Sequence, residues 1–387
     1  MRRGITGRYE ITAVAGEQVR AFVPNPLPPD PPISTEGAIQ PALEKANLAL
    51  GRLDAVTALL PDVALFLYAY VRKEAVLSSQ IEGIQSSLSD LLLFELDEAP
   101  GAPWADVVEV SNHVAALNHG LARLREGFPL SSRLLREIHE VLLARGRGSD
   151  RAPGEFRRSQ NWIGGSRPGN AVFVPPPPHL VPDCLANLEQ FLHSELPYVP
   201  ALVRAGVAHV QFETIHPFLD GNGRVGRLLV TLLLCQSGIL QEPLLYLSLY
   251  LKQHRATYYE LLGVARQEGD WESWLLFFLE GVRQTAGAAV STVRTLTTMF
   301  EEDRARINPG QRRAGSALRV HDALKSRPLL SVQEAVKRTG LTFPTVARAL
   351  ELLADLGIAR ELTGRRRNRV FAYPRYLAAL EEGTEPI

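Results

Sequence analysis

Apolar residues recur at three- and four-residue spacing through most of this 387-residue chain, a pattern typical of helices that bury one face. Between Ala38 and Glu98 the pattern breaks at Pro61, which predicts one helix on either side of that proline. Further helices are predicted at residues 104–125, 131–145, 199–213, 222–237, 247–268 and from 271 to near 307. The expected fold class is therefore mainly α.

Two segments depart from the helical pattern. The N-terminal segment ends in AFVPNPLPPDPPI, which holds too many prolines for a helix and predicts an extended arm laid over the surface. Further along, NWIGG, SRPGN and AVFV place β-prone runs around a turn rich in Gly, Pro and Asn. They predict a small exposed β-hairpin, which by itself would be an ordinary surface feature.

The C-terminal part reads as a separate module. After a linker-like stretch, NPGQRRAGS, the order helix, helix, turn, helix, hairpin outlines a winged helix-turn-helix. Its first motif helix is predicted at 331–338 and its recognition helix at 343–353, with Thr345 and Arg348 facing outward. The hairpin tip carries an arginine cluster able to neutralise phosphates, made of Arg365, Arg366, Arg367 and Arg369. DNA is the favoured partner, and docking of a protein or a second subunit is the alternative.

Charge and cysteine content narrow the function classes. The chain holds 42 Lys and Arg against 42 Asp and Glu, so any contact with nucleic acid must be local. The two cysteines, Cys184 and Cys235, stand far apart beside apolar residues, which suits buried thiols in a reducing compartment and predicts a cytoplasmic protein. No signal peptide or membrane anchor is indicated, and the longest apolar run, 228–235, is too short to span a bilayer.

One stretch carries most of the candidate chemistry: HPFLDGNGRVGR at residues 216–227, which leads into a predicted helix. Gly221, Asn222 and Gly223 can turn successive N–H groups inward as an anion nest, and the helix N-terminus adds unpaired donors. Arg224 and Arg227 lie at i and i+3 on one helix face. Their positive charges are unfavourable beside the partial positive charge of the helix N-terminus. A bound polyphosphate would make the placement favourable, because both arginines could then bind its oxygens.

Two further residues of this stretch can take part in a reaction. Asp220 lies at the rim of the loop, where one carboxylate together with substrate phosphates can hold Mg²⁺. His216 has the unperturbed pKa nearest neutrality and could take a proton from an attacking hydroxyl. A lone histidine before proline is usually an ordinary loop residue, and a lone Gly-Asn-Gly is usually a turn. The combination of histidine, carboxylate, glycine loop and two arginines within twelve residues is a specific signal of a reaction site.

HPFLDGNGRVGR resembles the signature of the Fic family, HPFx[D/E]GN[G/K]RxxR, at every fixed position. The resemblance extends to GEFRRSQNWIGG, to LLYLSLYLKQHRATYYELL and to the N-terminal AFVPNPLPP. It implies a helical-bundle core and the transfer of AMP from ATP to a Ser, Thr or Tyr hydroxyl of a target protein, with release of pyrophosphate. Relatives that transfer phosphate instead tend to carry Lys at position 223, so Gly223 favours AMP transfer.

The resemblance also implies roles for single residues. His216 would be the general base and Asp220 the Mg²⁺ ligand, while Asn222 and the loop N–H groups would hold the α- and β-phosphates and the two arginines the β- and γ-phosphates. The expected nucleotide-binding residues are Phe218, Gly221, Asn222, Gly223, Arg224, Arg227, Gln253 and His254. The last two would contact adenine, although relatives commonly carry Asn just before the basic residue, and Tyr258 and Tyr259 are interpreted as core.

In the family the exposed hairpin is the flap, whose strand edge pairs with an extended target peptide and brings its hydroxyl to the base. We define the flap here as residues 161–174. Its candidate target-binding residues are Ile163, Gly164, Gly165, Val172 and Phe173.

The stretch SSQIEG at 78–83 has two interpretations. Locally, Ser79 and Glu82 fit a helix capping box. By resemblance, the stretch matches the family's inhibitory motif, [S/T]xxxE[G/N], with Ser78, Glu82 and Gly83 at the fixed positions, upstream of the core as in the class with an N-terminal inhibitory helix. Glu82 would then pair with Arg227 where the γ-phosphate needs to bind, and the unmodified enzyme would be largely inactive.

The expected organisation is an arm and helical region with the inhibitory helix (1–103), a Fic catalytic core (104–285), a helical linker (286–311) and the winged module (312–380). The alternative function is a DNA-binding transcriptional regulator that uses the Fic core as a nucleotide sensor, and a phosphotransferase is a third. Whether Glu82 also assists removal of AMP from the target is open. Dimerisation fits a helical core of this kind, and no membrane partner is expected.

Overall fold

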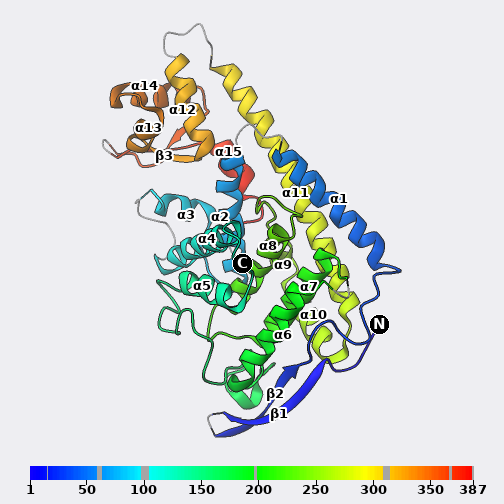
Figure 1. Ribbon diagram of the computed structural model, residues 1–387. Coiled ribbons are helices and arrows are strands. Elements are labelled where there is room, and N and C mark those ends of the chain that lie inside the picture. The colour runs from blue at the N-terminus through cyan, green and yellow to red at the C-terminus, as the bar shows by residue number, and fades with distance from the viewer. Residues whose placement is uncertain are drawn as a thin grey trace.

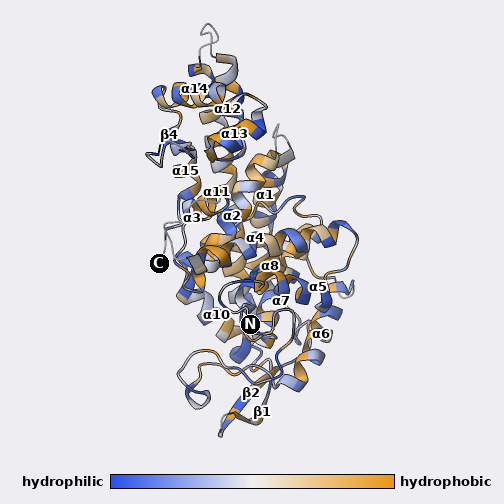
Figure 2. Cartoon of the chain, turned by 90° about the vertical axis from the view of Figure 1, so that its left-hand side faces the viewer, coloured by the Kyte–Doolittle hydropathy of each residue, from blue (hydrophilic) through white to orange (hydrophobic). Residues whose placement is uncertain are grey.

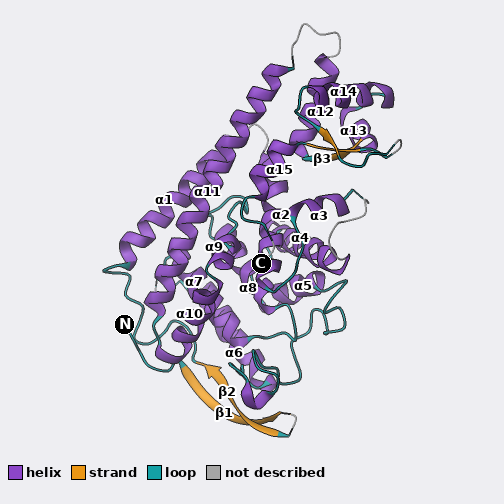
Figure 3. Cartoon of the chain, turned by 180° about the vertical axis from the view of Figure 1, so that it is seen from behind, coloured by secondary structure: helices purple, strands orange, loops and turns teal. Residues whose placement is uncertain are grey.

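The computed structural model describes residues 1–14, 16–58, 63–96, 104–195, 198–307, 314–365 and 368–385. The predicted helix break at Pro61 and most of the predicted linker after Ile307 lie outside these residues. The described chain is mainly helical, with short strands near two opposite ends of the molecule (Figure 3). The predicted mainly α class is therefore confirmed.

Two helices occupy the centre of the core. α7 (Ala201–Ile215) and α8 (Asn222–Gln236) pack against each other and are buried along nearly their whole length. Helices that are buried all round need neighbours on every side, and α4 (Trp104–Arg125), α5 (Ser132–Leu142) and α6 (Val181–His193) supply several of them. Figure 2 shows hydrophobic residues gathered around α4 and α8.

A long helix joins the core to the C-terminal module. α11 (Trp271–Arg306) has 36 residues, and at 1.5 Å per residue it is about 54 Å long. α1 (Ile39–Ala58) lies along it (Figure 1). The remaining core helices are α2 (Val63–Ile81), α3 (Leu88–Phe94), α9 (Ser248–Gln253), α10 (Arg255–Glu268) and the short 3-10 turn η2 (Pro178–Leu180).

The helix bounds differ from the sequence prediction at three places. The single helix predicted between Pro61 and Glu98 is divided into α2, which ends at Ile81, and α3, which begins at Leu88. α6 was not predicted, because prolines crowd its start and the preceding segment. The single helix predicted at 247–268 is interrupted at His254, whose φ of −114° and ψ of 36° end α9 before α10 begins. The other core helices were predicted to within a few residues, α4 with both of its ends.

The N-terminal segment forms an antiparallel hairpin that the prediction of an extended arm did not include. β1 (Gly7–Val14) and β2 (Glu17–Pro24) pair from Gly7 opposite Pro24 to Val14 opposite Glu17. The hairpin continues into the flap, since the N–H of Phe22 donates to Val174 O at 2.8 Å. The prolines that dominate the sequence pattern begin only at the end of β2.

The flap has less strand pairing than the predicted hairpin. Within it, only the bridge between Ile163 and Phe173 has strand pairing in the described structure, and the 3-10 turn η1 (Pro168–Asn170) lies between them. Gly164 and Gly165 follow Ile163 with φ of 68° and 73°. A side chain at Gly165 would collide with the backbone of Asn170, so this turn requires glycine.

The C-terminal module contains α12 (Ala314–Ser326), α13 (Val332–Thr339) and α14 (Phe343–Asp355), joined to a small antiparallel sheet. Its strands β3 (Leu329–Ser331), β4 (Arg360–Glu361) and β5 (Val370–Ala372) have the order β3-β5-β4. Gly340, with φ of 64°, ends α13 and starts the turn into α14. The helices and hairpin occur in the predicted order, and their assignment as a winged helix-turn-helix stays a prediction.

An unpredicted last helix, α15 (Pro374–Glu381), leads the chain back to the core, where it contacts α2, α3 and α11. The residues after it lie against α2. Lys73 Nζ donates to Glu382 O at 2.8 Å, and Gln80 Nε2 donates to Thr384 O at 2.7 Å. The described C-terminal residues thus pack against α2 of the core, and Figure 2 shows that the chain ends at the edge of the molecule. None of the described helices is long and apolar enough to cross a membrane.

Candidate active site

The loop between α7 and α8 carries the first half of the HPFLDGNGRVGR motif. His216 ends α7 in the left-handed conformation, with φ of 48° and ψ of 61°, and its N–H donates to Phe212 O at 2.9 Å. That backbone conformation costs a non-glycine residue about 1 kcal/mol, so the surroundings must enforce it. Gly221 then takes φ of 75° immediately before α8. These two turns direct the loop across the N-terminus of α8.

Asn222 closes the loop internally. Its Oδ1 accepts the N–H of Phe218 and its Nδ2 donates to Phe218 O, both at 2.8 Å. The side chain is buried, and both of its polar ends are used by these bonds. In this conformation only the backbone N–H of Asn222 is left for the expected contact with phosphates.

His139 of α5, which the sequence did not indicate as a site residue, packs against the loop. His139 Nδ1 accepts the N–H of Gly154 at 2.9 Å, so Nε2 carries the proton and donates to Asp220 O at 3.1 Å. The ring stacks on Phe218 with 3.7 Å between ring centres. Burial lowers the pKa of His139 to about 4, which keeps the ring neutral. His139 therefore fixes the backbone of Asp220 and the ring of Phe218.

His216 is half-buried and electrostatically held in its neutral form. Burial, followed by the positive charge of Arg157, lowers the pKa of His216 to about 4, while the Glu82 carboxylate opposes the shift. Its Nδ1 has no hydrogen-bond partner in the part of the chain that the structure describes. A neutral imidazole at pH 7 is the state that a general base requires.

Asp220 lies at the open side of the loop. Its Oδ1 accepts the N–H of Gly221 at 2.6 Å and lies 3.8 Å from Arg224 Nη2, and its side chain is 35% exposed. Among the described residues no group of three or more metal-binding side chains occurs. One partly exposed carboxylate suits Mg²⁺, which binds few carboxylates and completes its shell with substrate phosphates and water.

Arg224 is buried against α4 by an ion pair that was not predicted. Its Nη1 donates to Glu109 Oε2 at 3.0 Å, and the two side chains are only 4% and 3% exposed. Burial raises the pKa of Glu109 against the opposing charge of Arg224. A phosphate that binds Arg224 must share this guanidinium with Glu109 or replace that carboxylate.

Arg227 is held by the segment that the sequence analysis identified at the end of α2. Its Nε donates to Ser78 Oγ at 2.8 Å, and its Nη2 donates to Ser78 O at 2.9 Å and to Glu82 Oε1 at 2.7 Å. Burial alone would raise the pKa of Glu82, but Arg227 outweighs it and the pKa lies below its ordinary value. Glu82 is therefore a charged partner of Arg227.

The end of α2 and the start of α8 fit together at two glycines. Gly83, with φ of 89°, ends the helical turn directly after Glu82. A Cβ atom on Gly223 would lie 2.3 Å from Glu82 Oε1 and 3.0 Å from Arg227 Nη1. The absence of a side chain at position 223 is thus what lets the carboxylate lie against the N-terminus of α8.

Two more side chains border Arg227. Glu213 is buried with its Oε1 unpartnered in the described structure, and burial raises its pKa to about 7 although Arg227 opposes the shift. Tyr258 is buried as expected, whereas Tyr259 is 43% exposed and close enough to Glu82 and Arg227 for both charges to affect its pKa. The interpretation of Tyr259 as a core residue is therefore wrong.

The two residues predicted to contact adenine, Gln253 and His254, do not contact the HPFLDGNGRVGR loop in the described structure. Gln253 and His254 are exposed where α9 meets α10. The His254 ring contacts Tyr250 and Phe277, with 4.4 Å and 6.3 Å between ring centres. Within the described residues neither side chain forms a hydrogen bond or ring contact with the HPFLDGNGRVGR loop, so their role with adenine stays a prediction.

The flap lies over the motif side of the core and is anchored at both ends. Asn161 Nδ2 donates to Phe218 O at 3.1 Å, and Phe173 packs against Phe22 and under the guanidinium of Arg266. The Val172 side chain is 80% exposed. An exposed residue on an anchored strand edge is suited to contact an extended peptide.

The C-terminal candidates lie on the outer module. Thr345 Oγ1 pairs with Thr342 Oγ1 at 2.8 Å, Arg348 is exposed, and Arg369 lies 3.3 Å from Glu351 Oε1. Arg365 is also exposed. Arg366 and Arg367 lie outside the described residues, so the predicted cluster is described only in part.

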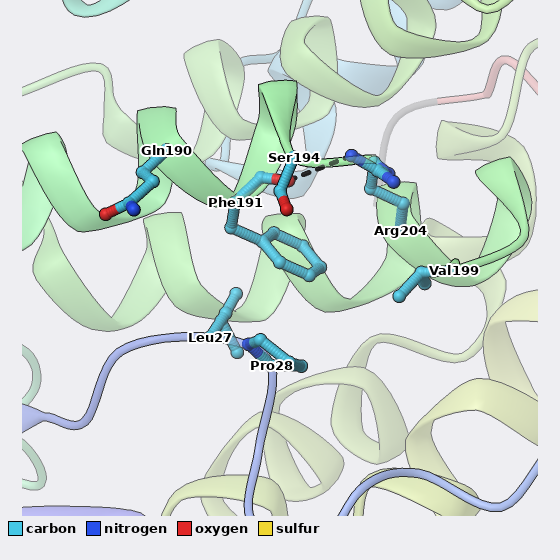
Figure 4. Close-up of a pocket in the computed structure, with 7 residues that line it drawn as sticks. All are labelled: Leu27, Pro28, Gln190, Phe191, Ser194, Val199 and Arg204. Atoms are coloured by element: carbon cyan, nitrogen blue, oxygen red, sulfur yellow. Dashed lines mark hydrogen bonds between the residues drawn. The ribbon is translucent and has the colours of Figure 1, made fainter. Parts of the chain in front are cut away.

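A surface pocket lies apart from this site, between the N-terminal arm and the helices α6 and α7 (Figure 4). Leu27 and Pro28 of the arm face Phe191, and Arg204 Nη1 donates to Phe191 O at 2.9 Å on the opposite wall. None of the residues that line the pocket belongs to the HPFLDGNGRVGR motif. The pocket therefore shows how the arm docks and adds nothing to the candidate chemistry.

The fold and the site define a helical protein in which a neutral histidine ends one central helix, a short loop follows it, and two buried arginines lie in the first turns of the next helix. Residues 129–234 match the Fic/DOC family, and residues 40–122 match the Fic/DOC family N-terminal region. The chain therefore contains a Fic domain preceded by the N-terminal domain of the same family.

Curated relatives share this region. The protein adenylyltransferase Fic of Culex quinquefasciatus is 36% identical over 152 residues, which are 39% of this chain and 27% of that protein. A probable protein adenylyltransferase of Aquifex aeolicus is 30% identical over 175 residues, 45% of this chain and 51% of that protein. The chain thus spans about half or less of the length of these relatives.

Solved structures share the fold. A Fic family protein from Desulfovibrio desulfuricans has a TM-score of 0.57 at 23% identity, over 88% of this chain and 97% of that one. A Fic domain containing signaling protein from Bacteroides thetaiotaomicron has a TM-score of 0.53 at 19% identity, over 64% of this chain and 95% of that one.

Proposed function

We propose that this protein transfers AMP from ATP to a Ser, Thr or Tyr hydroxyl of a target protein, and that Glu82 holds it in an inactive resting state. The observation that carries the proposal is the arrangement at the N-terminus of α8. There a neutral His216 and the open carboxylate of Asp220 lie on the loop that leads into α8, and Arg227 of that helix is bound by Ser78 and Glu82. The relatives named protein adenylyltransferase support the same reaction.

Each residue then has a task in the reaction. The loop N–H groups and Arg224 bind the phosphates, and Asp220 would hold Mg²⁺, which neutralises phosphate charge and orients the leaving pyrophosphate. His216 takes the proton of the target hydroxyl as its oxygen attacks the α-phosphorus, and pyrophosphate leaves. The flap edge at Val172 positions the target chain, so that the hydroxyl reaches the base.

In the resting state Glu82 is ion-paired with the Arg227 guanidinium, which the terminal phosphate of ATP needs as its ligand. Nucleotide can still bind the loop, but its phosphates cannot reach Arg227 while the 2.7 Å ion pair persists. Activation therefore requires that Glu82 leave Arg227.

The test uses the Glu82→Gly variant with Mg²⁺ and ATP labelled at the α- or the γ-phosphate, and scores label retained on protein. Label from the α position alone, lost on His216→Ala, is the expected result. Label from the γ position alone would make the protein a phosphotransferase. Label from neither position would favour a nucleotide-sensing regulator, and equal labelling by the wild type and the Glu82→Gly variant would exclude the inhibitory role of Glu82.

DNA binding by the C-terminal module is a second proposal, favoured by the outer face of α14, where Phe343 is 55% exposed and Arg348 is exposed. Binding of random duplex in a gel shift should weaken steeply with salt. Replacement of Arg365, Arg366 and Arg367 by alanine should reduce both the binding and its salt dependence. Salt-independent binding, or none, would favour the docking of a protein instead.

A further inference from the structure

Arg157 is a buried arginine that no part of the reaction described above uses. It lies in GEFRRSQNWIGG, before the flap, and is 3% exposed. Among the described residues no carboxylate pairs with its guanidinium, and its partners are all backbone carbonyls. A buried charge without a carboxylate is costly and calls for a specific explanation. Burial lowers the pKa of Arg157 to about 10, so it still carries its charge at pH 7.

The guanidinium joins three separate segments. Its Nε donates to His216 O at 2.9 Å, and one Nη2 contact reaches Ile215 O at 3.4 Å, so it holds the end of α7. The same Nη2 donates to Pro176 O at 2.5 Å, where the chain leaves the flap. Nη1 donates to Ser159 O at 3.5 Å, where the chain enters the flap.

The Arg157 backbone adds a fourth link, because its N–H donates to Pro217 O at 2.9 Å. The carbonyls on both sides of the His216–Pro217 bond are therefore held by one residue. This is the position at which the chain takes the left-handed conformation with φ of 48°. Only a planar group with several fixed donors can hold three segments at once, which is a property of arginine and not of lysine.

We propose that Arg157 is a positioning residue that fixes the distance and direction between the His216 imidazole and the flap that presents the target. It touches neither nucleotide-binding arginine, so its effect falls on the transfer step and not on ATP binding. The proposal rests on the proposed AMP transfer for its kinetic test and has a second test that needs no turnover.

The charge of Arg157 has a separable consequence for His216. Among the described residues, the charged side chains that influence this imidazole are Arg157 and Arg266, which lower its pKa, and Glu82, which raises it. Burial is the largest cause and persists in every variant with the same fold. Loss of the Arg157 charge therefore moves the titration of His216 to higher pH, whereas Arg157→Lys keeps the charge and loses the geometry.

The experiment compares Arg157→Gln, Arg157→Lys and the matched control Arg158→Gln, all in the Glu82→Gly background. Arg158 is the next residue in the chain, and its side chain is 89% exposed. For each variant we would measure self-labelling from α-labelled ATP as a function of ATP concentration and pH, the affinity for ATP, and the thermal unfolding midpoint. The His216 ring would be titrated by NMR with ¹³C-labelled histidine and assigned by His216→Ala.

Both Arg157 variants are expected to lower the maximal transfer rate by about 10- to 100-fold, as a misplaced catalytic group does, with ATP affinity unchanged. The His216 titration should move to higher pH in Arg157→Gln and stay near the parent in Arg157→Lys, and Arg158→Gln should match the parent throughout. Unchanged rates, or a loss explained by weaker ATP binding, would overturn the proposal.

If the Glu82→Gly parent transfers no AMP, the proposed function fails, and hydrogen exchange of the paired flap amides of Ile163 and Phe173 decides the Arg157 proposal. Faster exchange in both Arg157 variants than in Arg158→Gln supports the positioning role, and equal exchange refutes it. If Arg157→Gln does not fold, Arg157→Lys carries the same decision. A folded Arg157→Lys with parental transfer rates would show that charge alone is needed and would overturn the positioning role.

Discussion

Gly223→Ala should partly activate the enzyme, although position 223 lies in the phosphate-binding loop. The new Cβ would lie 2.3 Å from Glu82 Oε1, whereas ordinary contact begins at 3.4 Å, so the carboxylate must move by about 1 Å. Gly223 does not have a positive φ, so alanine is compatible with the backbone there. The substitution therefore acts on the ion pair between Glu82 and Arg227.

The size of the effect follows from the ion pair. Moving Glu82 Oε1 from 2.7 Å to about 3.8 Å from Arg227 Nη2 weakens the attraction by about 2 kcal/mol at an effective dielectric constant of about 20. Because the Glu82 side chain is 37% exposed, solvent screening reduces this to about 1 kcal/mol. The active population, and with it the labelling rate, should rise about fivefold.

The assay is labelling from α-labelled ATP in a double-mutant cycle of wild type, Gly223→Ala, Glu82→Gly and the double variant. The methyl group should raise the rate only when Glu82 is present, and in the Glu82→Gly background it should leave the rate unchanged or lower it slightly. Gly287→Ala, where a Cβ meets nothing within 4 Å, is the control for a general helix effect. The reasoning is refuted if Gly223→Ala changes the rate by the same factor in both backgrounds.

Three further predictions concern Glu74, Glu109 and Asp220. Glu74 is buried on α2 and accepts hydrogen bonds from the N–H and the hydroxyl of Ser248. Burial raises the pKa of Glu74 to about 7 from 4.5, so its contribution to stability is full below pH 4.5 and is lost as the pH rises through 7. Glu74→Gln should therefore recover about 3 kcal/mol of unfolding free energy at pH 8 relative to pH 4, measured by denaturant unfolding at both values. Glu109→Gln leaves the Arg224 charge without its carboxylate and should cost about 3 kcal/mol in the same measurement at pH 7, and an unchanged midpoint would contradict the buried pair. Asp220→Asn should abolish the Mg²⁺ dependence of ATP binding in calorimetry while binding without Mg²⁺ persists, and an intact Mg²⁺ dependence would remove Asp220 as the metal ligand.

Features encoded in neighbouring residues could be predicted from the sequence. The ends of α4 and the turn at Gly221 before α8 follow from periodicity and from glycines within a few residues. The pairing of Glu82 with Arg227 spans 145 residues, and only the family resemblance made it predictable.

Features that depend on distant partners could not be predicted in this way. Glu109 is one of two acidic residues on α4, the other being Asp106, and nothing local marks it as the partner of Arg224, 115 residues away. Arg157 bonds only to carbonyl oxygens, which every residue carries, so its sequence surroundings hold no signal of its role. The β1–β2 hairpin was obscured by the prolines that follow it.

The docking of the C-terminal residues on α2 has a consequence for how the protein is handled. Thr384 O accepts a hydrogen bond from Gln80, two positions before Glu82, and Lys252 Nζ bonds both Gln80 Oε1 and Gly383 O. A purification tag or fluorescent protein fused at that end would follow residues that contact the end of α2, directly before Glu82. Such a fusion is expected to disturb the same segment that a mutation near Glu82 would change. Preparations for the assays above should therefore carry their tags at the N-terminus, where Met1 lies against Glu272 at the surface.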